Sequence, residues 1–147
     1  MDRIDIKILN ILQRDASLPL ATIAKKVDLS TTPCFNRIKK LEEMGVIKKR
    51  IAILDNKKIN LPIVVFLSIT VAQHSKEWLE KFIDKLSSFD EVVEIYRLTG
   101  NSDYLIKIVA KSIEQYDNFN QVLIKEINFR SLNSNIVLKE IKNTNVL

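Results

Sequence analysis

The residues with the most definite chemistry lie in one stretch, LSTTPCFNRIKKLEEMG, from Leu29 to Gly45. If this stretch is a helix, a rotation of about 100° per residue places Cys34, Ile38 and Leu41 on one side and polar side chains on the other. Amide and guanidinium groups read base edges in a DNA groove, and hydroxyl and ammonium groups hold phosphates. We therefore predict a DNA-reading helix, although an ordinary solvated helix face has the same composition. Its candidate DNA contacts are Ser30 (also the expected N-cap), Thr31, Thr32, Pro33, Asn36, Arg37, Lys39 and Lys40.

Pro33 and Cys34 are unusual neighbours near the start of a helix, and each has a structural explanation. The first four N–H groups of a helix lack internal partners, so Pro33 in the first turn breaks no hydrogen bond, and the remaining groups favour a phosphate. Cys34 lies on the apolar side and is predicted to be a small core residue. With one cysteine and one histidine, His74, the chain offers neither a nucleophile–base pair nor a metal cluster. We predict no catalytic residue, no metal, no cofactor and no enzymatic activity.

Positive charge is concentrated in the same part of the chain. Residues 1–60 hold 13 Lys and Arg against 7 Asp and Glu, whereas residues 61–147 hold 10 against 11. A basic half beside a neutral half indicates that one unit meets a polyanion, although a basic surface without a partner gives the same count. Lys48 and Lys49, in the run KKR, are further candidate DNA contacts if the run is a phosphate-binding wing rather than a solvated segment.

The first half of the chain has the 3.6-residue period of helices. One apolar stripe runs from Ile4 to Leu12, a shorter one runs from Leu20 to Val27, and the third belongs to the stretch described above. Only the residues DLS separate the last two, which is typical of a helix-turn-helix. After Gly45, a natural helix stop, VIKKRIAILD alternates and is rich in β-branched residues, which predicts a strand.

The second half alternates strands with helices, beyond a boundary marked by the turn-forming DNKKIN and Pro62. The order β-α-β-β-α-β is that of a split, ferredoxin-like unit, so the whole chain is predicted to be α+β. The tight GNSD joins the two middle strands as a hairpin turn. Strands are expected at residues 63–71, 91–99, 104–111 and 135–141, and helices at 76–89 and 113–127.

The first strand of this sheet contains an unbroken apolar run from Ile63 to Leu67. A sheet covered by helices on one face should alternate apolar and polar residues, so both faces of this strand are suited to burial. The simplest cover for the second face is another copy of the sheet, which predicts a homodimer. A flanking segment of the same chain folded over the strand is the alternative.

The sequence resembles a known family in several separate motifs. Residues 2–49, from DRIDIKIL to GVIKK, closely resemble the N-terminal domain of Lrp/AsnC (feast/famine) transcriptional regulators. The specific part of the match is L-S-x-T-P-C-x-x-R-x-x-x-L-E, from Leu29 to Glu42. LTGNSDYLIKI and VLKEIKNT resemble signatures of the effector-sensing C-terminal domain of the same family, so the match covers nearly the whole chain in the right order.

This resemblance implies a domain plan and a function. Residues 1–50 would form a winged helix-turn-helix that binds operator DNA, 51–61 a linker strand and turn, and 62–147 a ferredoxin-like sandwich that senses an effector and oligomerises. Homodimers formed through the sheet would assemble into octamers. An amino acid such as leucine or methionine would shift assembly or DNA affinity.

The resemblance also assigns an effector loop. By position it consists of Gly100, Asn101, Ser102, Asp103 and Tyr104. Many members carry an aspartate where this chain has Asn101, and an amide offers an ammonium group a weaker, neutral hydrogen bond than a carboxylate does. Asp103 keeps one carboxylate in the loop. A hairpin turn and an effector loop are compatible interpretations of the same residues.

The remaining features fix the expected location of the protein. No apolar run approaches the roughly 18 residues that span a membrane. A single cysteine suits a reducing compartment, and MDRIDIKIL is unlike a signal peptide. A cytoplasmic, nucleoid-associated protein is therefore expected. An amino-acid-binding module without a DNA role is the alternative function, and the basic first half argues against it.

Overall fold

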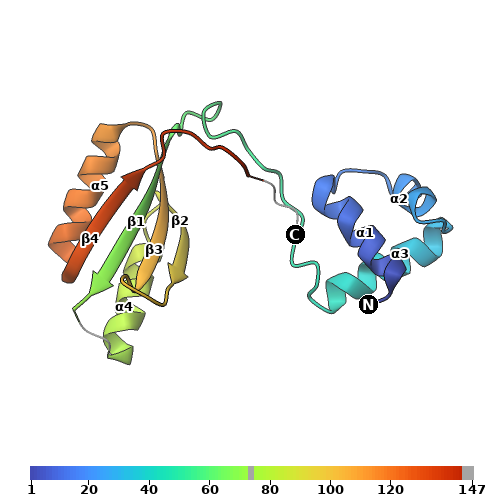
Figure 1. Cartoon of the computed structure of the whole chain (residues 1–147), viewed down its shortest axis with the longest axis horizontal. Helices are drawn as coiled ribbons and strands as arrows, with labels where there is room; N and C mark the ends of the chain where they lie inside the picture. The colour runs from blue at the N-terminus through green and yellow to red at the C-terminus, as the bar shows by residue number, and fades with distance from the viewer. Residues whose placement is uncertain (73–74, 144–147) are drawn as a thin grey trace. The chain divides into compact units, whose positions relative to one another are not determined.

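The computed structural model describes residues 1–72 and 75–143, so His74 lies outside the described residues. The chain divides into two compact units, one containing residues 1–53 together with the C-terminal residues from 141 on, and the other residues 54–140 (Figure 1). Each unit has its own hydrophobic core. The two cores correspond to the helical half and the strand-and-helix half of the sequence.

The first unit consists of three helices around a small core. These are α1 (Arg3–Arg14), α2 (Leu20–Lys26) and α3 (Thr31–Glu43), with Ser30 as the N-cap of α3, as predicted. The apolar stripes of the three helices meet, and the side chains of Ile8, Ile23 and Cys34 are almost completely buried. Ile38 and Leu41 complete the buried face of α3. Its opposite face is therefore left on the surface.

The turn between α2 and α3 is tight, because three residues separate the end of α2 from the α3 N-cap. Asp28 has φ of 59°, a left-handed conformation that Asp and Asn tolerate better than most side chains, and the Leu29 N–H donates to the Ala24 carbonyl at 3.0 Å. At the other end of α3, Gly45 (φ 70°) lets the Val46 N–H reach the Leu41 carbonyl at 3.0 Å. These two bends fix both ends of α3.

The strand expected in VIKKRIAILD is not present, and that prediction is wrong for the described chain. No strand lies between α3 and residue 63 in the part of the chain that the structure describes. Ile51 and Ile53 are 66% and 70% exposed. Alternation and β-branching give the segment strand propensity, but a strand also needs a neighbour to complete its hydrogen bonds. Among residues 1–72 and 75–143 no strand pairs with this segment.

The second unit is an antiparallel sheet with strand order β2-β3-β1-β4 and two helices. The predicted order β-α-β-β-α-β is confirmed. The predicted last strand, 135–141, is wrong in position: β4 begins at Phe129 because its alternate residues Ser131, Asn133 and Asn135 are polar and imitate a loop in the sequence. The elements are β1 (Ile63–Val71), α4 (Lys76–Ser87), β2 (Val92–Arg97), β3 (Tyr104–Ala110), α5 (Ile113–Glu126) and β4 (Phe129–Ile136).

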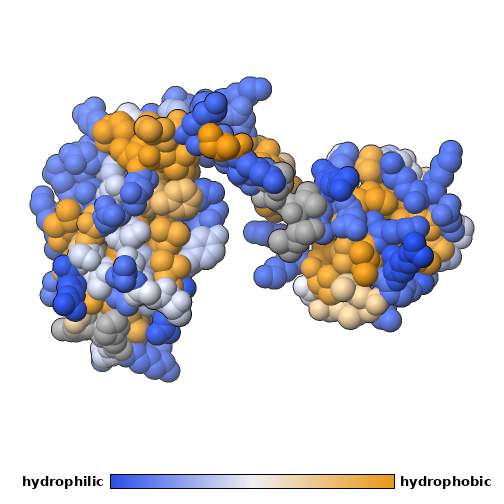
Figure 2. Space-filling model, in the orientation of Figure 1, coloured by the Kyte–Doolittle hydropathy of each residue, from blue (hydrophilic) through white to orange (hydrophobic). Residues whose placement is uncertain are grey.

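Helices α4 and α5 both pack on one face of this sheet. Phe82 of α4 and Phe119 of α5 belong to the same buried cluster as Val65 and Leu67 of β1. Burial alternates along β1, so Val64 and its even-numbered neighbours turn to the uncovered face and are only partly buried. Figure 2 shows hydrophobic and hydrophilic residues side by side on the surface of this unit. The apolar run in β1 therefore supplies apolar side chains to both faces of the sheet.

Candidate nucleic-acid interface and ligand pocket

The outer face of α3 gathers most of the predicted DNA contacts on one rigid element. All of them except Arg37 are exposed, and Lys48 and Lys49 are exposed on the segment that follows Gly45. Lys39 lies 3.7 Å from Glu43, whereas Lys40, Lys48 and Lys49 have no ion-pair partner among the described residues. The helix thus presents an amide, Asn36, and one uncommitted ammonium group, Lys40, and the segment after Gly45 adds two more.

The N-terminal end of α3 is suited to an anion. The first turn contains no acidic residue, and the Ser30 hydroxyl makes no capping hydrogen bond within the described chain. The N–H groups of Thr31 and Thr32 lie at the positive end of the helix dipole, with hydroxyl groups on the same two residues. A phosphate placed here would meet donors rather than carboxylates.

Arg37 differs from the other candidates, because its guanidinium group is tied to α1. Its Nη1 donates to Asp2 Oδ2 at 2.7 Å and to Asp5 Oδ1 at 2.8 Å. Asp2 and Asp5 are the N-cap and N3 residues of α1, and each carboxylate accepts from the backbone N–H of the other. The three side chains form a cluster, the Arg37 clamp, that links the start of α1 to the middle of α3.

The clamp sets the protonation of its own carboxylates. The Asp5 N–H and then the Arg37 guanidinium lower the pKa of Asp2, and the Asp2 N–H and then Arg37 lower the pKa of Asp5. The same contacts raise the pKa of Arg37, with Asp5 contributing most. All three groups are therefore charged at neutral pH, and the positive charge of Arg37 is offset locally by two negative ones.

Phe35 is a surface residue of α3 that sequence analysis did not select. Its side chain is 52% exposed, between the buried Cys34 and the outward Asn36. An exposed phenylalanine on a helix that also carries base-reading groups is suited to the methyl group of thymine. The signal was present in the helical rotation, which places Phe35 about 100° from the core residue Cys34.

The predicted effector loop is fastened to the end of β1. The Asp103 N–H donates to the Ile69 carbonyl at 2.9 Å, and Asp103 Oδ2 accepts from the Val71 N–H at 2.9 Å. The Thr70 hydroxyl donates to the Asn101 carbonyl at 3.2 Å. The pairing of β1 with β4 shifts between Thr70 and Val71, so Asp103 satisfies an N–H group at an irregular point in the strand. Asp103 therefore has a structural partner before any ligand is considered.

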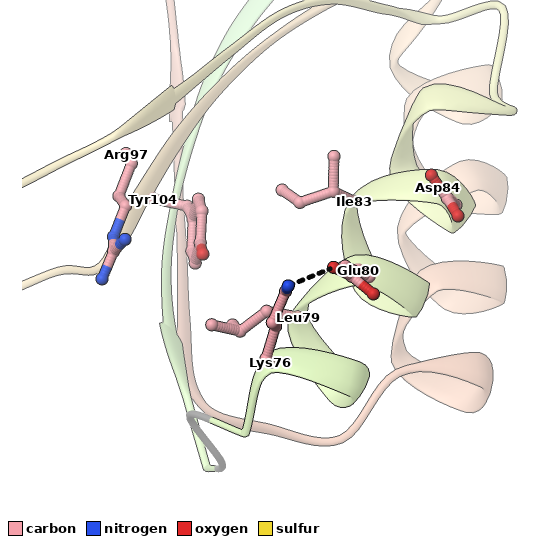
Figure 3. Close-up of a pocket in the computed structure, with 7 residues that line it drawn as sticks. All are labelled: Lys76, Leu79, Glu80, Ile83, Asp84, Arg97 and Tyr104. Carbon is pink, nitrogen blue, oxygen red and sulfur yellow. Dashed lines mark ion pairs between the residues drawn. The ribbon is translucent and has the colours of Figure 1, made fainter.

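A groove opens beside this loop, between α4 and the ends of β2 and β3 (Figure 3). Its volume is about 410 Å³. Arg97 and Tyr104 lie on the strand side, Leu79 and Ile83 face them from α4, and Lys76 pairs with Glu80 at 3.8 Å (Figure 3). We call this the α4 groove; its lining residues are Lys76, Leu79, Glu80, Ile83, Asp84, Arg97 and Tyr104. Of the predicted loop residues, Tyr104 alone lines it.

Cys34 is the one cysteine of the chain. Burial raises the pKa of the Cys34 thiol, and its side chain is fully buried, in agreement with a core role. Within residues 1–72 and 75–143, no group of three or more His, Cys, Asp and Glu side chains could hold a metal ion. The same ranges contain no helix long and apolar enough to cross a membrane.

Two family models match the chain in separate segments. A winged helix-turn-helix DNA-binding model matches residues 1–48, and the Lrp/AsnC ligand binding domain matches residues 64–147. The second match alone covers more than half of the chain. The α3 interface lies in the first segment and the α4 groove lies in the second.

Individual proteins are similar over the full length. The glutamate uptake regulatory protein of Zymomonas mobilis is 40% identical over 147 residues, which is 100% of this chain and 90% of that protein. The DNA-binding transcriptional activator DecR of Escherichia coli is 34% identical, covering 100% and 97%. A crystal structure of an AsnC family regulator from Agrobacterium tumefaciens superposes with a TM-score of 0.94 at 50% identity, covering 100% and 96%. A regulator from Neisseria meningitidis, solved as a complex with L-Met, gives 0.94 at 30% identity with the same coverage.

Proposed function

The chain belongs to the Lrp/AsnC family of DNA-binding transcriptional regulators, and on that premise we propose which of its residues bind DNA and which respond to an effector. The observation that carries the proposal is the outer face of α3. It combines Asn36, an exposed aromatic ring and the unpaired Lys40 on a helix held by a tight turn, in the basic unit of the chain.

We assign the contacts by their chemistry. Asn36 reads a base edge from the middle of α3, because an amide can donate and accept at once. Lys40, Lys48 and Lys49 neutralise phosphates, and Lys39 does so after leaving Glu43. The end of α3, with Ser30, Thr31, Thr32 and Pro33, lies against a phosphate through its hydroxyl and N–H groups.

Arg37 is assigned a positioning role instead of a direct contact. Its Nη1 is occupied by two carboxylates, and its charge is balanced by them. A helix that reads bases must be held in position to within a fraction of an ångström. The Arg37 clamp joins the middle of α3 to the start of α1. Loss of the clamp should therefore misalign α3 without removing a phosphate contact.

Phe35 is assigned to sequence discrimination. A half-exposed phenyl ring beside Asn36 gains by covering a thymine methyl group, because that contact removes apolar surface from water. The operator half-site should then contain a thymine next to the base that Asn36 reads. Replacing that thymine by uracil, which lacks only the methyl group, isolates the contact with Phe35.

A homodimer is the proposed binding unit. The uncovered sheet face carries Val64 and Phe66, opposite Val109 and Lys107 of β3, so a second sheet would bury apolar surface there. Lys107 pairs with Glu94 at 2.9 Å, which satisfies the one ammonium group in that patch of described residues. Further assembly to octamers is proposed from the family resemblance. Sedimentation of the parent and of Phe66→Glu tests both, and a monomeric parent would refute them.

The effector is proposed to be an amino acid that acts on the loop from Gly100 to Tyr104. The ligand-binding family match and the solved L-Met complex of a relative support this class of ligand. The loop is hydrogen-bonded to the end of β1, a central strand of the sheet, so a ligand at the loop can alter the face that couples the two copies. We assign no catalytic step to the chain, and we place it on DNA in the cytoplasm.

Binding to the upstream region of its own gene tests the function directly. We expect the full chain to shift that fragment at low salt, and a scrambled fragment only at higher protein concentration. Asn36→Ala should reduce the preference between the two fragments, whereas Lys81→Ala, in α4 of the second unit, should leave it unchanged. Equal binding of both fragments by the parent would refute sequence-specific regulation.

A further inference from the structure

We propose that Glu94 of β2 and Lys107 of β3 form a cluster of four charges across the homodimer, in which Lys107 of each copy binds Glu94 of the other. The inference rests on the proposed homodimer and adds the residues that fix the register of its two sheets. The uncovered sheet face is thereby assigned to a second copy of this chain in one orientation.

The pair lies within the apolar part of the uncovered face. Lys107 is in the middle of β3, and its side chain shares a face with Leu105 and Val109, because alternate residues of a strand point the same way. Across the strands it is paired with Phe66 on one side and Glu94 on the other. Lys107 Nζ lies 2.9 Å from Glu94 Oε1, and the two side chains are 27% and 38% exposed. Apolar side chains therefore surround this ion pair on three sides.

The polar part of the same face lies on β4. Ser131, Asn133 and Asn135 are exposed there, and Asn135 is paired with Phe66 of β1. A second copy that removes apolar surface from water is therefore centred over β1 and β3 rather than over β4. Because Lys107 lies at the centre of that region, we place the twofold axis of the dimer near it.

The pair keeps hydrogen-bonding capacity for a partner. An ammonium group has three donors, and among the described residues Lys107 donates only to Glu94. Glu94 accepts from Lys107 and, at 2.6 Å, from the Tyr96 hydroxyl, which uses two of about four acceptor sites of a carboxylate. The Tyr96 hydroxyl and then Lys107 lower the pKa of Glu94, so it is an anion at neutral pH.

A second copy supplies the charges that the pair needs. A purely apolar cover would be unfavourable, because it takes both charges out of water and adds no hydrogen bond. Twofold symmetry brings a second Glu94 and a second Lys107, and neighbouring strands are only about 4.8 Å apart, so all four groups lie close to the axis. Each ammonium group then has a carboxylate from its own copy and one from the partner. Sliding one sheet would bring like charges together, so the cluster selects one register.

Charge reversal in the full-length chain tests the cluster. Lys107→Glu leaves only carboxylates at the cluster, and Glu94→Lys leaves only ammonium groups. We expect each variant alone to dimerise at least about tenfold more weakly than the parent, because like charges then meet across the axis. An equimolar mixture should form a heterodimer at least as tight as the parent dimer, because every contact across the axis is then between opposite charges. Sedimentation equilibrium measures all of these dissociation constants.

A swapped chain, carrying both Glu94→Lys and Lys107→Glu, keeps an ion pair within each copy, so its folding does not depend on a partner. Mixed with the parent, it would place carboxylate against carboxylate across the axis. We therefore expect each chain to pair with its own kind. Native mass spectrometry of the mixture should find heterodimers well below the half that random pairing gives.

Glu77 and Lys81 provide matched controls. They form an ion pair of 2.8 Å on the exposed side of α4, away from the uncovered sheet face. Glu77→Lys and Lys81→Glu should therefore dimerise like the parent. If the reversed variants also dimerise like the parent, if their mixture is as weak as each alone, or if the swapped chain pairs with the parent at random, the charge cluster is wrong and the homodimer stands. A monomeric parent overturns the homodimer as well.

Discussion

The Arg37 clamp leads to a quantitative prediction about the salt dependence of DNA binding. Each phosphate neutralised by a lysine or arginine adds about 0.9 to the slope of log affinity against log salt. A dimer in which Lys40 contacts one phosphate per protomer should lose about 1.8 of that slope in Lys40→Gln. Arg37→Gln should lose affinity but almost none of the slope, because the charge of Arg37 is already offset by Asp2 and Asp5.

Asp5→Asn separates a clamp from a direct contact. Its carboxylate side chain is 15% exposed and accepts from Arg37 at 2.8 Å, so the clamp loses its better-buried partner in this variant. If Arg37 positions α3, Asp5→Asn weakens binding as Arg37→Gln does. If Arg37 instead contacts DNA, the variant releases the guanidinium group and removes a negative charge, so binding tightens and the slope steepens.

The assay is fluorescence anisotropy with a labelled upstream fragment over a series of potassium chloride concentrations. Lys81→Gln, on α4 in the second unit, controls for the loss of one positive charge and should leave slope and affinity unchanged. A loss of about 1.8 in the slope of Arg37→Gln, with tighter binding by Asp5→Asn, would refute the positioning role.

Three further predictions concern the first unit. Gly45→Ala should lower the free energy of unfolding by about 1 kcal/mol in chemical denaturation, since φ is 70° while the space around the position is open, and Gly45→Asn should lower it less. The pKa values of Asp2 and Asp5 are lowered on folding, so these carboxylates stabilise the folded state fully above the ordinary pKa of 3.8. That stabilisation is lost as pH falls through the lower pKa values of the folded state. Circular dichroism against pH should therefore show a shallower acid transition for Asp5→Asn. Phe35→Ala should bind thymine and uracil versions of one operator equally, whereas the parent prefers thymine; a parent that does not discriminate would exclude the methyl contact.

The helices of the first unit could be predicted because each has a local signal. The stripes of Ile8, Ile23 and Cys34 repeat at helical spacing, and Ser30 and Gly45 mark the ends of α3. The sequence signal for a strand is less local, because a strand also depends on the strand beside it. The segment containing Ile51 and Ile53 has the residues of a strand, but it pairs with no strand in the part of the chain that the structure describes. In contrast, β4 pairs with β1, although its polar residues resemble those of a loop.

The sites could be predicted only in part for the same reason. The outward residues of α3 follow from its rotation about Cys34, but the partners of Arg37 lie 32 and 35 positions away, and no pattern within α3 indicates them. The α4 groove joins α4 to residues at the ends of two strands, so it exists only once the helix is packed on the sheet. The effector role of Asp103 stays a prediction, and its hydrogen bond from the Val71 N–H is visible only in the fold.

Selection from random duplexes by the full-length protein is the most direct test of the account as a whole. A dimer that reads DNA with α3 should enrich a pseudo-palindrome whose half-sites are about 10 base pairs, or a multiple of one helical turn, apart. Asn36→Ala should alter the base at one position in each half-site. Recovery of unenriched duplexes, or of a single unrepeated site that Asn36→Ala leaves unchanged, would contradict it.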